Sequence, residues 1–244
     1  MNPMLTIARR EFRSYFDSPL AYVVICLGLV MLGFVFFILN GGFWQADRAT
    51  LTALFAQAPR GLSFLVVPVV TMRLLAEEKR TGTLEMLITL PVKDSDVILG
   101  KYLGGLGLVL TLIGATIVYP FAMFRWPWSL GPLDWGPVLS GYLGLTLFSA
   151  ATVAIGLLVT ALTESQAISF FITFFVLALL WFVGDVAGFI AGNLGDVLQY
   201  VSFQTRIAGF SRGIVDTRDV VFFLSVTALA LAVAFRALER RKWA

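Results

Sequence analysis

The chain has 244 residues, of which 59% are hydrophobic and 14% are charged. A soluble domain carries roughly a quarter charged residues, so a water-soluble fold is excluded, and the apolar runs leave no room for a separate soluble catalytic domain. The net charge of +3 is scattered between apolar runs, which excludes nucleic acid as a partner. With no histidine and one cysteine, the chain also cannot form a Ser/His/Asp triad, a histidine-ligated zinc site or an intrachain disulfide.

Residues 1–19 form the first distinct segment. They set Leu5, Ile7 and Phe12 among arginines at positions 9, 10 and 13, a mixture typical of a helix that lies in the membrane interface. The alternative is a positively charged flank that only orients the next helix. A full-length apolar run follows without an A-x-A-like cleavage motif, so we expect this segment to be retained rather than removed as a signal peptide.

Six apolar segments are long enough to cross the hydrocarbon core of a bilayer as helices, which takes about 20 residues. They cover residues 20–39, 60–76, 97–124, 138–162, 167–191 and 220–236. The second segment is short and contains Pro68, so we expect it to extend into one flank. Residues 163–166 permit only a tight helical hairpin. The sequence therefore predicts an all-α membrane protein whose single transmembrane domain has six helices.

Residues 193–219 precede the last span and mix apolar with charged side chains. This composition favours short helices that dip into the outer leaflet, with an ordinary extracellular loop as the alternative. Lysine and arginine indicate the orientation, because cytoplasmic flanks are enriched in them. With the N-terminus inside, twelve fall on inner flanks and six on outer ones, namely Arg48, Arg60, Arg125, Arg206, Arg212 and Arg218. We therefore expect both termini in the cytoplasm.

The segment after the second span carries the most information about function. Charged residues give way at position 82 to a short run with apolar residues at helical spacing, and a proline ends it. Thr83 is a suitable N-cap, and Glu85 favours the first turn through the helix dipole. The run is Gly82, Thr83, Leu84, Glu85, Met86, Leu87, Ile88, Thr89, Leu90 and Pro91. The sequence predicts a short cytoplasmic helix whose apolar face either enters a groove on another protein or rests on the bilayer.

This region resembles the first cytoplasmic loop of type-2 ABC exporter permeases. The matching residues are Glu77, Glu78, Lys79, Arg80, Thr81, Gly82, Thr83, Leu84, Glu85, Met86, Leu87 and Pro91. The resemblance extends over almost the whole chain: an amphipathic start, six spans, the 163–166 hairpin and a polar segment before the last span. Within that class, residues 202–206 and 210–213 are most similar to the gliding-motility-associated permeases.

The resemblance implies a mechanism and a set of partners. Residues 82–91 would be the coupling helix, seated in a cleft of a cytoplasmic ATPase subunit, and Glu77 and Glu78 would end the second span at that contact. ATP and Mg would be bound by that partner, because this chain has no G-x-x-x-x-G-K-[ST] motif. We expect no cofactor, metal or catalytic residue here. Two permeases and two ATPases would assemble as an exporter in the bacterial inner membrane.

Three glycines recur every four residues near the end of the fifth span. Gly184, Gly188 and Gly192 form a small-residue stripe that permits close approach of another helix. The stripe predicts either packing within one subunit or a seam with a second permease copy. Asp185 lies beside it, and a carboxylate in a membrane span is a candidate for the transport pathway or for a cap at the outer interface.

Two other classes of function stay open from the sequence. A secondary transporter driven by an ion gradient would place ionisable residues at mid-membrane, and apart from Asp185 we find none well inside a predicted span. A non-transporting membrane anchor would merely recruit a soluble partner. ATP-dependent transport into vesicles would separate that anchor from an exporter.

Overall fold

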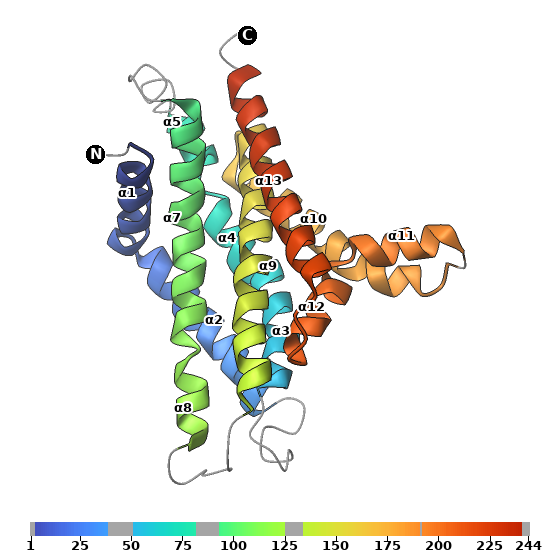
Figure 1. Cartoon of the computed structure of the whole chain (residues 1–244). Coiled ribbons are helices and arrows are strands. Elements are labelled where there is room, and N and C mark those ends of the chain that lie inside the picture. The colour runs from blue at the N-terminus through green and yellow to red at the C-terminus, as the bar shows by residue number, and fades with distance from the viewer. Residues whose placement is uncertain (1–2, 39–50, 82–92, 125–133, 191, 241–244) are drawn as a thin grey trace.

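The computed structural model describes residues 3–38, 51–81, 93–124, 134–190 and 192–240, and every element among them is a helix (Figure 1). The elements are α1 (Pro3–Asp17), α2 (Pro19–Phe37), α3 (Thr52–Gly61), η3 (Leu62–Val66), α4 (Val67–Thr71), α5 (Ala76–Thr81), α7 (Asp94–Ala115), α8 (Val118–Phe124), α9 (Trp135–Leu162), α10 (Gln166–Ala187), α11 (Asn193–Val201), α12 (Phe203–Ser211) and α13 (Thr217–Arg240). Six stretches are long and apolar enough to cross a membrane. The prediction of an all-α membrane protein is confirmed.

Helix α9 is the centre of the bundle. Its glycines let neighbouring helices approach closely, because a Cβ at Gly141 would overlap the ring of Phe55 on α3, and one at Gly156 would overlap Thr71 on α4. Helices α7, α12 and α13 also pack on α9. By contrast, α10 and α13 expose many large apolar side chains, as expected of helices whose outer faces meet lipid.

The second span is assembled from short pieces. Helices α3, η3 and α4 follow one another directly, and residues 72–75 turn the chain into α5. Pro59 and Pro68 lack the N–H that closes a helical hydrogen bond, and their rings crowd the preceding turn. The backbone between them widens into the π-helix η3. The helical stretch starts at Thr52 rather than at residue 60, so the extension lies on the N-terminal side.

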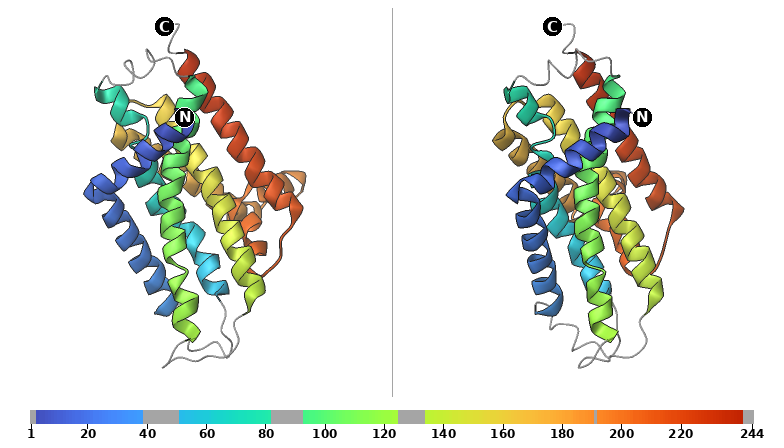
Figure 2. Two further views of the ribbon diagram at one scale, coloured as in Figure 1. Left: turned by 60° about the vertical axis from the view of Figure 1, so that its left-hand side comes forward. Right: turned by 90° about the vertical axis from the view of Figure 1, so that its left-hand side faces the viewer.

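Helix α1 is separated from α2 by a sharp bend. Proline disfavours the helical conformation in the residue before it, and Ser18 before Pro19 is extended, with φ −104° and ψ 151°. Figure 2 shows that α1 consequently lies across α7 instead of continuing the line of α2. Helix α1, α5, the start of α7, the end of α9 and the end of α13 share one end of the bundle, called the terminal end below (Figure 1).

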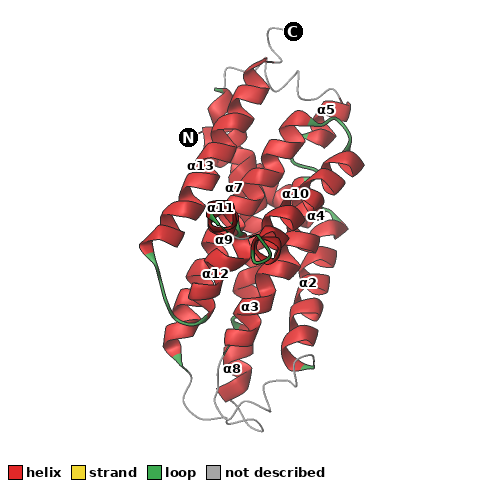
Figure 3. Cartoon of the chain, turned by 90° about the vertical axis from the view of Figure 1, so that its right-hand side faces the viewer, coloured by secondary structure: helices red, strands yellow, loops and turns green. Residues whose placement is uncertain are grey.

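The segment before the last span forms α11 and α12. Helix α11 lies beside α10 and projects with it from the side of the bundle (Figures 1 and 3). Helix α12 turns back onto α9, where Ser140 Oγ donates to the carbonyl oxygen of Phe210 at 2.7 Å. Arg206 joins α12 to α13 through Asp219, with its Nη1 2.8 Å from Oδ1, and its guanidinium lies 3.8 Å from the ring centroid of Tyr200. These contacts fix the segment on the bundle.

Candidate functional site: a charged cluster between α1, α5 and α7

Two glycines one turn apart bring α1 against α7. A Cβ on Gly104 would lie 2.6 Å from the Cβ of Glu11, and one on Gly100 would lie 2.7 Å from Cγ2 of Ile7. Both distances are too short for a real Cβ, so any larger residue would push the helices apart. The close approach places Glu11 directly over Lys101, the residue after Gly100.

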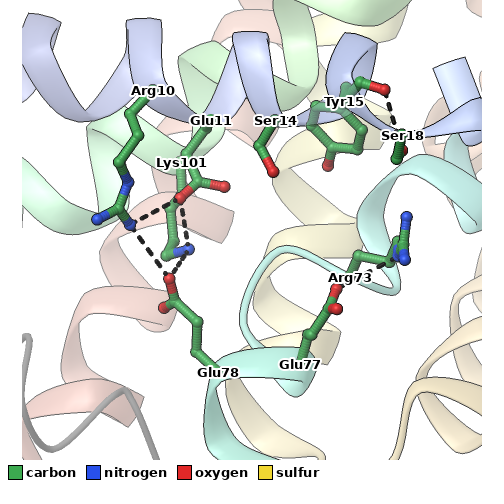
Figure 4. Close-up of a pocket in the computed structure, with 9 residues that line it drawn as sticks. All are labelled: Arg10, Glu11, Ser14, Tyr15, Ser18, Arg73, Glu77, Glu78 and Lys101. Carbon is green, nitrogen blue, oxygen red and sulfur yellow. Dashed lines mark hydrogen bonds and ion pairs between the residues drawn. The ribbon is translucent and has the colours of Figure 1, made fainter. Parts of the chain in front are cut away.

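Lys101 is the centre of the cluster at the terminal end (Figure 4). Its side chain is 1% exposed, and its Nζ lies 3.1 Å from Oε1 of Glu11 on α1 and 2.8 Å from Oε1 of Glu78 on α5. Arg10 on α1 covers both carboxylates from outside, with Nη2 at 3.3 and 3.5 Å. A buried charge is tolerated when it is paired, and here the pairing ties three helices together.

The residue after Glu78 ties α5 to a fourth helix. Lys79 Nζ donates to the carbonyl oxygens of Thr160, Ala161 and Thr163 at the end of α9. The last carbonyls of a helix have no partner within it, and a lysine there also complements the helix dipole. Helix α5 is therefore fixed by neighbouring residues on two sides, toward α1 and α7 through Glu78 and toward α9 through Lys79.

A cavity of about 460 Å³ lies beneath α1, lined by the nine residues labelled in Figure 4. Arg73 Nε and Glu77 Oε2 form an ion pair of 3.3 Å on its floor. Tyr15 is buried and donates its hydroxyl to the carbonyl oxygen of Val70 at 2.8 Å. Burial, and secondly the charge of Glu11, raise the pKa of Tyr15 above its ordinary value, which keeps the phenol neutral as a donor.

The cluster is suited to holding helices in place. The cations that line the cavity are matched in number by carboxylates, namely Arg10, Arg73 and Lys101 by Glu11, Glu77 and Glu78. Within the described ranges, no group of three His, Cys, Asp or Glu side chains is placed to hold a metal ion. A movement of α5 would therefore be passed to α1, α7 and α9 through short polar contacts.

Comparison with protein families assigns the chain. The family model of ABC-2 family transporter proteins matches residues 61–235, which is more than half of the 244 residues. The chain belongs to the ABC-2 transporter family. It is a multi-pass permease component of an ABC transporter rather than the catalytic ATPase, and the family implies partnership with an ABC ATPase. A comparison with curated proteins gave no match.

The structure of this ABC-2 permease brings Glu77 and Glu78 into the charged cluster. Glu78 reaches Lys101, and Glu77 pairs with Arg73. Helix α5 ends at Thr81, directly before the run predicted to be the coupling helix. That run, residues 82–91 with Gly82, Thr83, Leu84, Glu85, Leu87 and Pro91, lies outside the described residues. Its role as a coupling helix stays a prediction.

The three glycines of the fifth span lie in different settings in the permease. Gly184 packs within the subunit, because a Cβ there would overlap Ser202 before α12, whereas a Cβ on Gly188 meets only a backbone oxygen of α10. Gly192 has φ +95°, a conformation that favours glycine, and precedes α11. Asp185 is exposed on the projecting part of α10. A dimer seam at this stripe and a pathway role for Asp185 stay predictions.

Several residues of the cluster were not foreseen from the sequence. Glu11 reads as part of an arginine-rich interfacial helix, and Lys101 as a residue at the start of a span. The available signal was the pair of glycines at positions 100 and 104, which form a small-residue stripe like that of the fifth span. A lysine one residue from such a stripe needs a carboxylate on the helix that packs there.

Proposed function

We propose that this permease is the transmembrane subunit of an ABC exporter in a bacterial inner membrane. It forms the substrate pathway and couples it to hydrolysis of ATP, which a separate cytoplasmic ATPase binds with Mg. Family membership supports the permease role, and a chain without a phosphate-binding G-x-x-x-x-G-K-[ST] motif needs that partner. The proposal stops at the exporter class, since the similarity to gliding-motility-associated permeases rests on residues 202–206 and 210–213.

The observation that carries this proposal is the fixation of α5 on two sides. An ATPase can move a membrane helix only through a contact stiff enough to transmit its closure. Helix α5 leads directly into residues 82–91, and its Glu78 and Lys79 contact α7 and α9, two helices that extend into the bundle. A displacement of residues 82–91 by a partner would reach the membrane spans by this route.

The expected assembly has two permeases and two ATPases, with both permease termini in the cytoplasm. The excess of lysine and arginine on the inner flanks supports this orientation. The arrangement of the chain supports it too, because α1, α5 and the end of α13 lie together at the terminal end (Figure 1). In this orientation both termini and α5, which leads into residues 82–91, would lie at the cytoplasmic surface.

The test replaces Leu84 and Leu87 together with aspartate. If residues 82–91 lie in a groove of the ATPase, two unpaired carboxylates in that groove cost several kcal/mol, so the permease should insert normally and lose its partner or its coupling. Replacement of both residues with methionine is the matched control, because it keeps the face apolar. Co-purification of the ATPase and ATP-dependent transport in vesicles are measured. Normal values of both in the aspartate variant would show that this segment is not the coupling helix.

A further inference from the structure

Arg60 lies inside a membrane-spanning stretch. The stretch runs from Thr52 to Lys79, and at 1.5 Å per residue its 28 residues measure at most about 42 Å. The hydrocarbon core is about 30 Å thick. Arg60 lies eight residues, or about 12 Å, along this stretch from Thr52.

The guanidinium of Arg60 has no carboxylate partner among the described residues. None of their ion pairs or side-chain hydrogen bonds includes it, and the side chain is exposed. The guanidinium lies over the ring of Trp181 on α10, with Cζ 5.8 Å from the ring centroid. Charges in membrane spans are costly, and they face a partner or a water-filled path rather than lipid. A charge at this position is stabilised by water at the membrane surface, by a water-filled path or by an anionic ligand.

A cluster of aromatic rings lies close to this cation along the chain. Phe64 lies one turn after Arg60, and its ring stacks on that of Phe182 with centroids 5.7 Å apart and an interplanar angle of 22°. Phe174 contributes a third ring at 5.7 Å from Phe64. Trp181 is buried at 2% exposure, while Phe182 is 46% exposed. A charged group thus stands beside an accessible apolar surface formed by α10 and η3.

The backbone around Arg60 is irregular. Pro59 precedes it within α3, and the π-helix η3 starts two residues later. Pro59 removes a backbone donor from the helix, and a π-turn shifts the positions of the side chains that follow relative to those before it. Such turns occur frequently at functional sites. The irregularity lies where Arg60 and Phe64 meet α10.

We propose that Arg60, Trp181, Phe64 and Phe182 form a binding site for an amphipathic anion carried by the exporter. The guanidinium would bind the carboxylate or phosphate of the cargo through its planar fork while it stacks on Trp181, and the apolar part of the cargo would lie on Phe64 and Phe182. The inference rests on the proposed exporter function. It adds the chemical class of the cargo and the place where its anionic group is held.

The test measures binding of a defined probe to the permease purified with its ATPase. The probe is undecanoate with a dansyl group at its far end, and its methylamide is the uncharged match. Energy transfer from tryptophan to dansyl reports binding. A charge-assisted contact predicts that the wild type binds the carboxylate about tenfold more tightly than the amide. Arg60→Gln should remove that difference and Arg60→Lys should keep part of it, while Arg212→Gln, a change at an exposed arginine between α12 and α13, should leave it intact.

Three results would overturn the assignment. The first is a wild type that does not distinguish the two probes, and the second is an Arg60→Gln variant that still does. The third is loss of the dimer in Arg60→Asp and in Asp185→Arg with recovery in the double variant, which would show that Asp185 of a second copy occupies Arg60. The proposed exporter function is tested by a different measurement. It would be wrong if the wild-type permease bound no ATPase, and that result does not depend on how the probes bind.

Discussion

Lys101 and Arg60 are both cations within membrane-spanning stretches, yet their surroundings are opposite. Lys101 is 1% exposed and contacts two carboxylates from two other helices, whereas Arg60 is exposed and contacts a ring. The first lies where glycines bring α1 against α7. The second lies where prolines and a π-helix interrupt the second span.

The difference separates a charge that serves the fold from a charge that is available to a ligand. A buried ion pair contributes little by its presence, but removal of one partner leaves the other charge buried and uncompensated. An exposed cation that has no carboxylate partner among the described residues shows no such dependence on them. We therefore expect Lys101 variants to change stability, and Arg60 variants to change binding.

The largest effect is expected for Lys101→Met. It keeps the length of the side chain but leaves Glu11 and Glu78 without their shared buried cation, which should lower the free energy of unfolding by about 3–5 kcal/mol. Arg60→Met is the matched control and should lie within about 0.5 kcal/mol of wild type. Thermal unfolding in detergent, followed by tryptophan fluorescence, measures both. An equal loss of stability in the two variants would contradict the inference that Lys101 stabilises the fold and Arg60 does not.

The helices and the membrane class were predictable because they depend on local apolar runs. The irregular second span was harder to predict. Pro68 indicated that the helix extends beyond the apolar run but not at which end, and the helical stretch starts at Thr52, ahead of Arg60, rather than at residue 60. The contacts of Lys101 depend on residues 90 and 23 positions away, Glu11 and Glu78. No local pattern pairs these three residues, so the cluster required the structure.

A smaller effect is expected for Lys79→Met. The change removes the donor that satisfies three carbonyls at the end of α9, at a cost of about 1–2 kcal/mol. Hydrogen exchange at residues 158–165 should increase, because the last turn of α9 and the hairpin to α10 lose their anchor on α5. Lys93→Met, at an exposed lysine before α7, should leave exchange there unchanged. Unaltered exchange in Lys79→Met would mean that α5 does not hold the end of α9.

The smallest effect is expected for Arg10→Met, although Arg10 contacts the same carboxylate oxygens as Lys101. Its side chain is 59% exposed and its Nη2 lies 3.3 and 3.5 Å from Glu11 and Glu78, so water screens the interaction and replaces it when the guanidinium is lost. Exposed pairs contribute about 0–1 kcal/mol. The unfolding temperature of Arg10→Met should therefore be close to that of wild type and well above that of Lys101→Met. A higher salt concentration should reduce any remaining difference in unfolding temperature between Arg10→Met and wild type, because salt screens exposed ion pairs more than buried ones. If Arg10→Met lost as much stability as Lys101→Met, the contribution of each cation to stability would not depend on its burial.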